Sequence, residues 1–168
     1  MFFWFVGLSM ALVWVVFRSP AFDYRLVAVG AVLGSAESAL LGRPAVLHTL
    51  VGSVAALGGV MAATRGRRLR RRRWLGVPIG MFLHLVLDGV WADTELFWWP
   101  GFGFGFARGA GPEFARWPMV LVMEIVGVAT MMWWARRWKL GEPARRERFL
   151  RSGQVGRDLA GAVEEAGC

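Results

Sequence analysis

The sequence predicts an all-α integral membrane protein with about five transmembrane helices, and three observations lead to this fold class. The composition is 56% hydrophobic and 14% aromatic, with 10 Trp and 12 Phe in 168 residues, more than a small soluble core needs. Long stretches lack the alternation of apolar and polar residues that a soluble domain shows. The cations gather beside these stretches instead of spreading evenly along the chain.

Five apolar segments approach or reach the length of a transmembrane helix, which is about 20 residues with a range of about 17–25. They cover residues 2–17, 26–41, 45–64, 74–92 and 118–135. The first has neither a positively charged start nor a cleavage site, so we expect a retained span and not a signal peptide. The second is short and rich in Gly, Ala and Ser, which favours close packing inside a bundle.

The distribution of Lys and Arg predicts the orientation of the spans. One basic segment, residues 65–73, joins the third and fourth spans, and a second covers residues 136–151. Positively charged loops stay in the cytoplasm, so both regions are expected there. An odd number of spans then places the N-terminus outside and the C-terminus inside. The remaining cations that would be external are Arg43, Arg108 and Arg116.

This topology predicts a multi-pass protein of the bacterial plasma (inner) membrane. Residues 1–138 would form a helical transmembrane domain, and residues 139–168 a charged cytoplasmic tail. A net charge of +8 could also indicate nucleic-acid binding, but the charges flank apolar spans. We therefore expect membrane lipids, and no nucleic acid, as partners. The single cysteine, Cys168, offers neither an intramolecular disulfide nor a thiolate metal site.

Five ionisable residues lie within the apolar segments, and the predicted topology places all of them at one depth. They are Glu37, His48, His84, Asp88 and Glu124. At about 1.5 Å per helical residue, each lies within roughly 12 Å of the outer boundary of the membrane. A charged side chain at the bilayer centre costs about 2.5–3.5 kcal/mol on insertion scales, so such a group suggests a function. The orientation came from the cations alone, so the shared depth is an independent indication of a polar site in the extracytoplasmic half.

The spacing of His84 and Asp88 is four residues, which places both on one face of a helix. An imidazole and a carboxylate at this spacing can share a divalent cation, or the carboxylate can orient the imidazole. His48 and Glu37 could complete a shell of two nitrogens and two oxygens for Zn²⁺, Mn²⁺ or Fe²⁺. An open position holding water would then allow hydrolysis, with Glu124 as a candidate general base or supporting group.

The stretch GMFLHLVLDGVWADTELFWWP, residues 80–100, resembles a motif of the bacterial YdjM-like membrane-bound metal-dependent hydrolases. In that family a "sHlllD" helix precedes a short loop and an apolar segment ending in proline, and His84 and Asp88 match its His and Asp. Glu37 stands where an earlier acidic residue of the family falls, and His48 where the last "HS" of a "HRg.tHS" pattern falls. The family's Pro-Asp-x-Asp and His-Arg pairs are absent. The resemblance implies a polytopic membrane protein with a metal-dependent hydrolase site.

The sequence therefore predicts a membrane-bound metal-dependent hydrolase acting on a lipid or another membrane-near substrate. The alternative is a non-enzymatic membrane protein whose buried His, Asp and Glu cluster pins helices together or relays protons. A small transporter is the least favoured class, because the inner halves of the spans carry no ionisable residue.

Overall fold

The computed structural model describes residues 1–20, 22–103 and 118–156, and all regular secondary structure in these ranges is helical. The all-α fold class is confirmed for this part of the chain. In chain order the elements are α1 (Phe2–Phe17), α2 (Tyr24–Leu41), η1 (Val46–His48), α3 (Leu50–Ala63), α4 (Arg68–Trp74), α5 (Gly76–Asp88), η2 (Val90–Ala92), α6 (Thr94–Phe97), α8 (Met119–Arg137) and α9 (Pro143–Ser152).

Two helices, α2 and α8, are long and apolar enough to cross a membrane. Their 18 and 19 residues correspond to about 27 and 28 Å, close to the thickness of the hydrocarbon core. Helices α1 and α3 are apolar but shorter. In the described part of the chain, two of the five predicted spans are thus helices long enough to cross a membrane. The complete five-span topology stays a prediction.

The third and fourth apolar segments differ from the continuous helices that hydropathy predicts. Thr49 is extended (φ −109°, ψ 151°), and its hydroxyl accepts a hydrogen bond from Gly52 N at 2.9 Å, so it starts α3 as a helix cap. Helix α5 ends at Asp88 because Gly89 takes the left-handed conformation, with φ 76°. These caps turn the chain at the same end of the molecule and leave α3 only 14 residues long.

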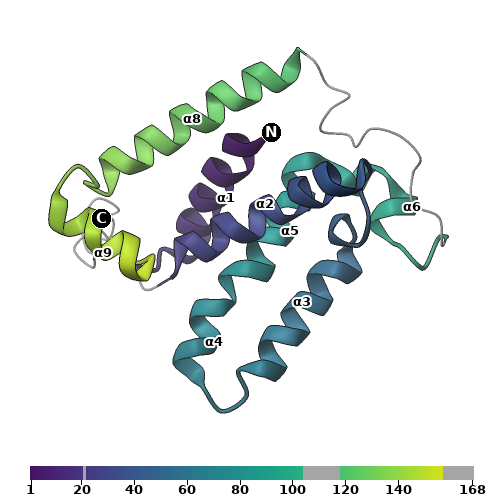
Figure 1. Ribbon diagram of the computed structural model, residues 1–168, viewed down its shortest axis with the longest axis horizontal. Coiled ribbons are helices and arrows are strands. Elements are labelled where there is room, and N and C mark those ends of the chain that lie inside the picture. The colour runs from purple at the N-terminus through teal and green to yellow at the C-terminus, as the bar shows by residue number, and fades with distance from the viewer. Residues whose placement is uncertain (21, 104–117, 157–168) are drawn as a thin grey trace, which may run out of the picture.

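Helices α2 and α5 form the most extensive helix pair in the described structure, and small residues let them approach closely (Figure 1). Gly30 and Gly34 lie on α2, and Gly76 and Gly80 lie on α5. A Cβ added at Gly80 would lie 2.8 Å from the amide nitrogen of Ala31, so only glycine permits this backbone separation. The close packing that the small residues of the second segment predict is confirmed.

Helix α8 lies on the outside of the bundle and packs mainly on α1 (Figure 1). Its contact again depends on glycine, because a Cβ on Gly7 would lie 2.6 Å from the carbonyl oxygen of Gly127. Its outer face exposes large apolar side chains such as Val122 and Ile125. A face of this kind suits contact with lipid.

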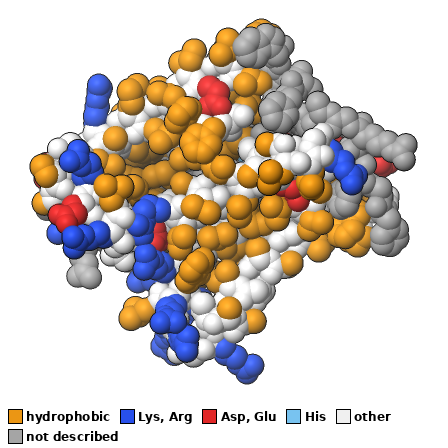
Figure 2. Space-filling view, viewed as in Figure 1, with side chains coloured by type: hydrophobic (Ala, Val, Ile, Leu, Met, Phe, Trp, Pro, Cys, Tyr) orange, Lys and Arg blue, Asp and Glu red, His pale blue; other side chains and the backbone are white. Residues whose placement is uncertain are grey.

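The basic regions meet around Asp23, at the start of α2. The carboxylate of Asp23 accepts hydrogen bonds from Arg73 at 2.7 Å and from Arg25 at 3.2 Å. Arg25 also donates to the carbonyl oxygens of Leu150 and Arg151 near the end of α9. Most Lys and Arg side chains in Figure 2 accordingly gather over α9 and α4. The two regions that positive charge assigned to one side of the membrane are therefore connected, although which side faces the cytoplasm stays a prediction.

The described part of the predicted tail is attached to the helical bundle. Val155 belongs to the main buried apolar cluster, and Phe149 packs against that cluster. The amide nitrogen of Val155 also donates to the carbonyl oxygen of Pro20 at 3.2 Å. Residues 157–168, and with them Cys168, lie outside the described residues.

Candidate metal centre

Three of the residues selected from the sequence meet at one point in the structure. His48, His84 and Asp88 offer ligand atoms that all lie within 4.8 Å of one another. Their exposed fractions are 0%, 1% and 0%, so the group is fully buried. His48 comes from η1, whereas His84 and Asp88 come from the last turns of α5. The shared helix face expected from the spacing of His84 and Asp88 brings both side chains to the same site.

The tautomer of His84 follows from a hydrogen bond to the backbone of α2. Its Nδ1 lies 2.8 Å from the carbonyl oxygen of Ala31, and a carbonyl can only accept, so Nδ1 carries the proton. Nε2 therefore presents a lone pair, 3.4 Å from Nε2 of His48. The ring of Phe5 packs on the His84 ring with a centroid separation of 4.0 Å, which holds the imidazole plane in place.

His48 is oriented in the same way by the carboxylate of Glu37. One carboxylate oxygen lies 3.1 Å from Nδ1 of His48, and the two oxygens together accept from the amides of Ala45 and Leu47 at 3.0 Å each. A carboxylate that accepts the Nδ1 proton leaves Nε2 of His48 as a second lone pair. Glu37 thus contacts the ring nitrogen of His48 that does not face His84.

Gly34 provides the space for the His84 ring, and the sequence analysis did not select it. A Cβ at this position would lie 2.5 Å from Cδ2 and 3.1 Å from Cε1 of His84, and closer still to Nε2. The available signal was its spacing of four residues from Gly30 in a segment already rich in small residues. Ser38, also on α2, places its hydroxyl 3.4 Å from Nε2 of His48.

Glu124 lies at a different place at the same end of the molecule. Its carboxylate accepts hydrogen bonds from the amides of Phe2 and, at 2.8 Å, of Phe3, and it lies 3.6 Å from the N-terminal ammonium of Met1. A negative charge there is favourable because the start of a helix carries partial positive charge. Neither Glu124 nor Glu37 belongs to the buried group of three. The direct ligation expected of Glu37 and the general-base role expected of Glu124 stay predictions.

Arg43, Arg108 and Arg116 were the cations expected on the outer side. Arg43 lies in the turn between α2 and η1, at the same end as the buried group. Arg108 and Arg116 lie outside the described residues.

The buried group fits a divalent cation in both chemistry and spacing. Two nitrogens bound to one zinc at about 2.0–2.1 Å in tetrahedral geometry lie about 3.3–3.4 Å apart. The two Nε2 atoms are 3.4 Å apart, and their Nδ1 atoms are already engaged elsewhere. Two imidazoles and a carboxylate suit Zn²⁺ and Fe²⁺, and three protein ligands leave a further position open. His48, His84 and Asp88 could therefore hold a metal ion, of a kind that the residues alone do not specify.

No family model, curated protein or solved structure matches the chain.

Proposed function

We propose that this protein is a membrane-bound metal-dependent hydrolase whose divalent metal is held by Nε2 of His48, Nε2 of His84 and the carboxylate of Asp88. The observation that carries the proposal is the 3.4 Å separation of the two Nε2 atoms inside a buried group that includes a carboxylate. A divalent cation bound there supplies a Lewis acid that brings the pKa of water near neutrality.

The residues around the ligands maintain the state that metal binding requires. The Ala31 carbonyl and the Glu37 carboxylate hold the proton of each imidazole on Nδ1, so each Nε2 atom carries the lone pair that a metal requires. Asp88 supplies a negative charge in a site with no exposed surface. The Ser38 hydroxyl donates to Nε2 of His48 at 3.4 Å, and with a metal on that nitrogen its proton would instead be offered to a substrate oxygen.

An apolar cavity supports the choice of a membrane-near substrate. It has a volume of about 360 Å³ and lies between α1, α3 and α5. Phe82 and Leu83, which directly precede His84, line it, as does Ser53, one turn after Thr49. Its size lies within the range of ligand pockets, about 300–1,000 Å³. An acyl chain of a membrane-near substrate would fit this cavity.

Complete burial favours one other function for the same residues. A metal site or polar cluster without exposed side chains can have a purely structural role, in which it holds helices together as buried polar groups in membranes do. In that case removal of the site would lower stability, and the protein would hydrolyse nothing.

The test combines metal analysis with an activity screen on protein purified in detergent. The proposal predicts about one metal ion per chain and hydrolysis of acyl or phosphate esters that is lost on chelation and restored by Zn²⁺, Mn²⁺ or Fe²⁺. Asp88→Asn should lose both properties. The matched control is Asp93→Asn, because Asp93 lies outside the group and caps α6 through Leu96 N.

The outcomes separate the candidates. Metal bound without hydrolysis of either ester class would favour the structural role. Absence of metal from the wild-type protein, or an Asp88→Asn variant that keeps metal and activity, would overturn the proposal.

A further inference from the structure

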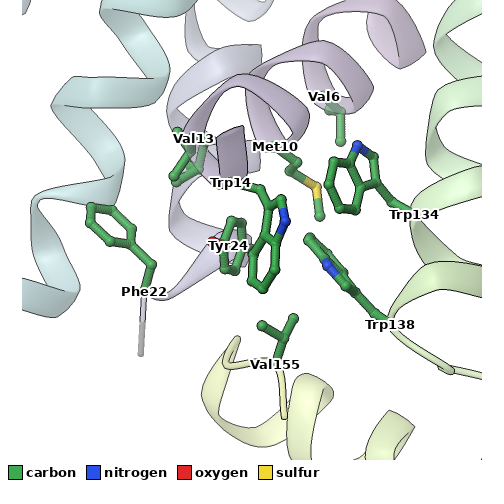
Figure 3. Close-up of a cluster of buried hydrophobic side chains, with 10 residues drawn as sticks. Val6, Met10, Val13, Trp14, Phe22, Tyr24, Trp134, Trp138 and Val155 are labelled. Atoms are coloured by element: carbon green, nitrogen blue, oxygen red, sulfur yellow. The ribbon is translucent and has the colours of Figure 1, made fainter. Parts of the chain in front are cut away.

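At the basic end of the molecule, far along α1 and α2 from the metal centre, aromatic side chains form a buried cluster (Figure 3). Trp138 is its centre: its ring lies 4.9 Å from Tyr24, 5.2 Å from Trp134 and 6.0 Å from Trp14 between centroids. The rings come from α1, the segment before α2, α2, α8 and the residue after α8, and Val155 closes the cluster from the C-terminal side.

A cavity of about 290 Å³ lies beside this cluster. It is apolar over nearly all its surface, so it suits a hydrocarbon chain better than a polar metabolite. The charged residue on its wall is Arg25, whose guanidinium is hydrogen-bonded to Asp23 and to the carbonyl oxygens of Leu150 and Arg151. Its larger lining side chains include Met10, Tyr24, Arg25, Trp134, Trp138 and Phe149.

Two polar atoms on this wall have no acceptor among the described residues. They are the indole Nε1 atoms of Trp134 and Trp138, whose side chains are 4% and 1% exposed. An indole N–H can only donate, and a buried donor without an acceptor is unfavourable. Both residues line the cavity with their rings, whereas the Nε1 atoms themselves are covered by protein.

The charge around the cavity is positive. Asp23 is shared by two guanidiniums, those of Arg25 and Arg73, so the trio keeps an excess positive charge. Arg136 and Arg137 occupy the last turn of α8, directly before Trp138. An anion is therefore the favoured ligand group at this rim.

We propose that this cavity binds one anionic phospholipid, with an acyl chain among the apolar and aromatic walls and the phosphate at the basic rim near Arg136 and Arg137. The site is separate from the metal centre and does not depend on hydrolysis. A nucleic acid or an acidic peptide would use the surface cations but would leave the apolar cavity unfilled. An anionic lipid uses both features, and Trp and Arg side chains are typical of the membrane interface.

The experiment compares lipid retention in two variants with the same substitution. Ala28 lines the cavity, so Ala28→Leu reduces the space for an acyl chain. Ala55→Leu is the control, because Ala55 lies on the exposed side of α3 and away from this cavity. Each protein is reconstituted in vesicles of phosphatidylcholine and phosphatidylglycerol with identical acyl chains, extracted in mild detergent and analysed by native mass spectrometry. Thermal unfolding of each variant confirms that it is folded.

Wild type and Ala55→Leu should retain one phosphatidylglycerol per chain. The expected preference over phosphatidylcholine at equal mole fraction is about fivefold, the factor that corresponds to about 1 kcal/mol per interfacial cation. Folded Ala28→Leu should lose this retention, and brominated phosphatidylglycerol should quench Trp fluorescence more in wild type than in a Trp134→Phe, Trp138→Phe double variant. Equal retention of the two lipids, or an unchanged folded Ala28→Leu, would overturn the proposal and leave only non-specific lipid contact.

Discussion

Gly34 packs directly against the imidazole of His84, and replacing it with alanine disturbs the metal centre without removing a ligand. The added Cβ would lie 2.5 Å from Cδ2 and 3.1 Å from Cε1 of the ring. Carbon atoms in favourable contact are about 3.5–4.0 Å apart, so the ring or the helix must move by about 1 Å. The ring has little freedom to do so, because Ala31 O holds Nδ1 at 2.8 Å and Phe5 packs on its face.

The expected effect on metal binding is large, and the expected loss of stability is moderate. Ligand distances at a metal site are held within about 0.2 Å, so a displacement of about 1 Å is several times the tolerance. We expect Gly34→Ala to weaken metal affinity about 10–100-fold, the range seen when groups behind the ligands are changed. The overpacking costs about 1–3 kcal/mol, and the higher helix propensity of alanine offsets up to about 1 kcal/mol of it. The variant should therefore still fold.

The assay is a titration of the metal-loaded protein with a competing chelator, together with thermal unfolding in detergent. The control is Gly58→Ala on α3, where an added Cβ meets no described atom within 4 Å. It should keep the wild-type metal affinity and gain slightly in stability. If Gly34→Ala binds metal as tightly as Gly58→Ala does, Nε2 of His84 does not ligate the metal in this geometry.

Three further substitutions test the surroundings of the site. Glu37→Gln removes the charged acceptor of the His48 Nδ1 proton, so it should lower metal affinity about 10–100-fold in the chelator titration. An unchanged affinity would show that Glu37 does not orient the His48 ring. Gly80→Ala would place a Cβ 2.8 Å from Ala31 N and should lower the free energy of unfolding by about 1–3 kcal/mol, whereas wild-type stability would contradict the close α2–α5 packing. Glu124→Gln should lower the free energy of unfolding by about 0.3–1 kcal/mol, because it weakens the interaction with the start of α1. The metal content should stay unchanged. Loss of metal in this variant would assign Glu124 to the metal centre.

The part of the site that lies on one helix could be predicted from the sequence. The helical repeat alone brings His84 and Asp88 to the same face, and the structure places both in the buried group. His48 was selected by its depth below the membrane surface, and it also belongs to the group. In the fold, the small residues of α2 indicated close packing, because glycine is the residue that lets helix backbones approach.

Depth in the membrane is only one coordinate, and it does not say which of the residues at one depth come together. Glu37 and Glu124 have the same predicted depth as the histidines, yet Glu37 contacts the far nitrogen of the His48 ring and Glu124 contacts the start of α1. The remaining coordinates depend on how the helices rotate and cross, which is decided by packing between segments distant in sequence. A hydropathy window also cannot detect a cap, so the break at Thr49 was not expected.

The residues that shape the centre without ligating it were beyond sequence reasoning for the same reason. Ala31 contributes a backbone carbonyl, which every residue type has, and Phe5 is one of 12 phenylalanines. Their role exists only because α1, α2 and α5 meet at His84. Gly34 could be noticed as a helical glycine, but its partner could not be named before the α2–α5 crossing was known.

The central claim is that two imidazoles and one carboxylate hold a metal ion within the helical bundle, and X-ray absorption at the edge of the bound metal tests it most directly. The wild-type protein should contain about one divalent metal per chain, with the multiple-scattering pattern of two imidazole ligands from His48 and His84 and further scattering from oxygen. His84→Ala should lose the metal or show one imidazole. A spectrum without imidazole scattering, or a wild-type protein that takes up no metal, would contradict the account.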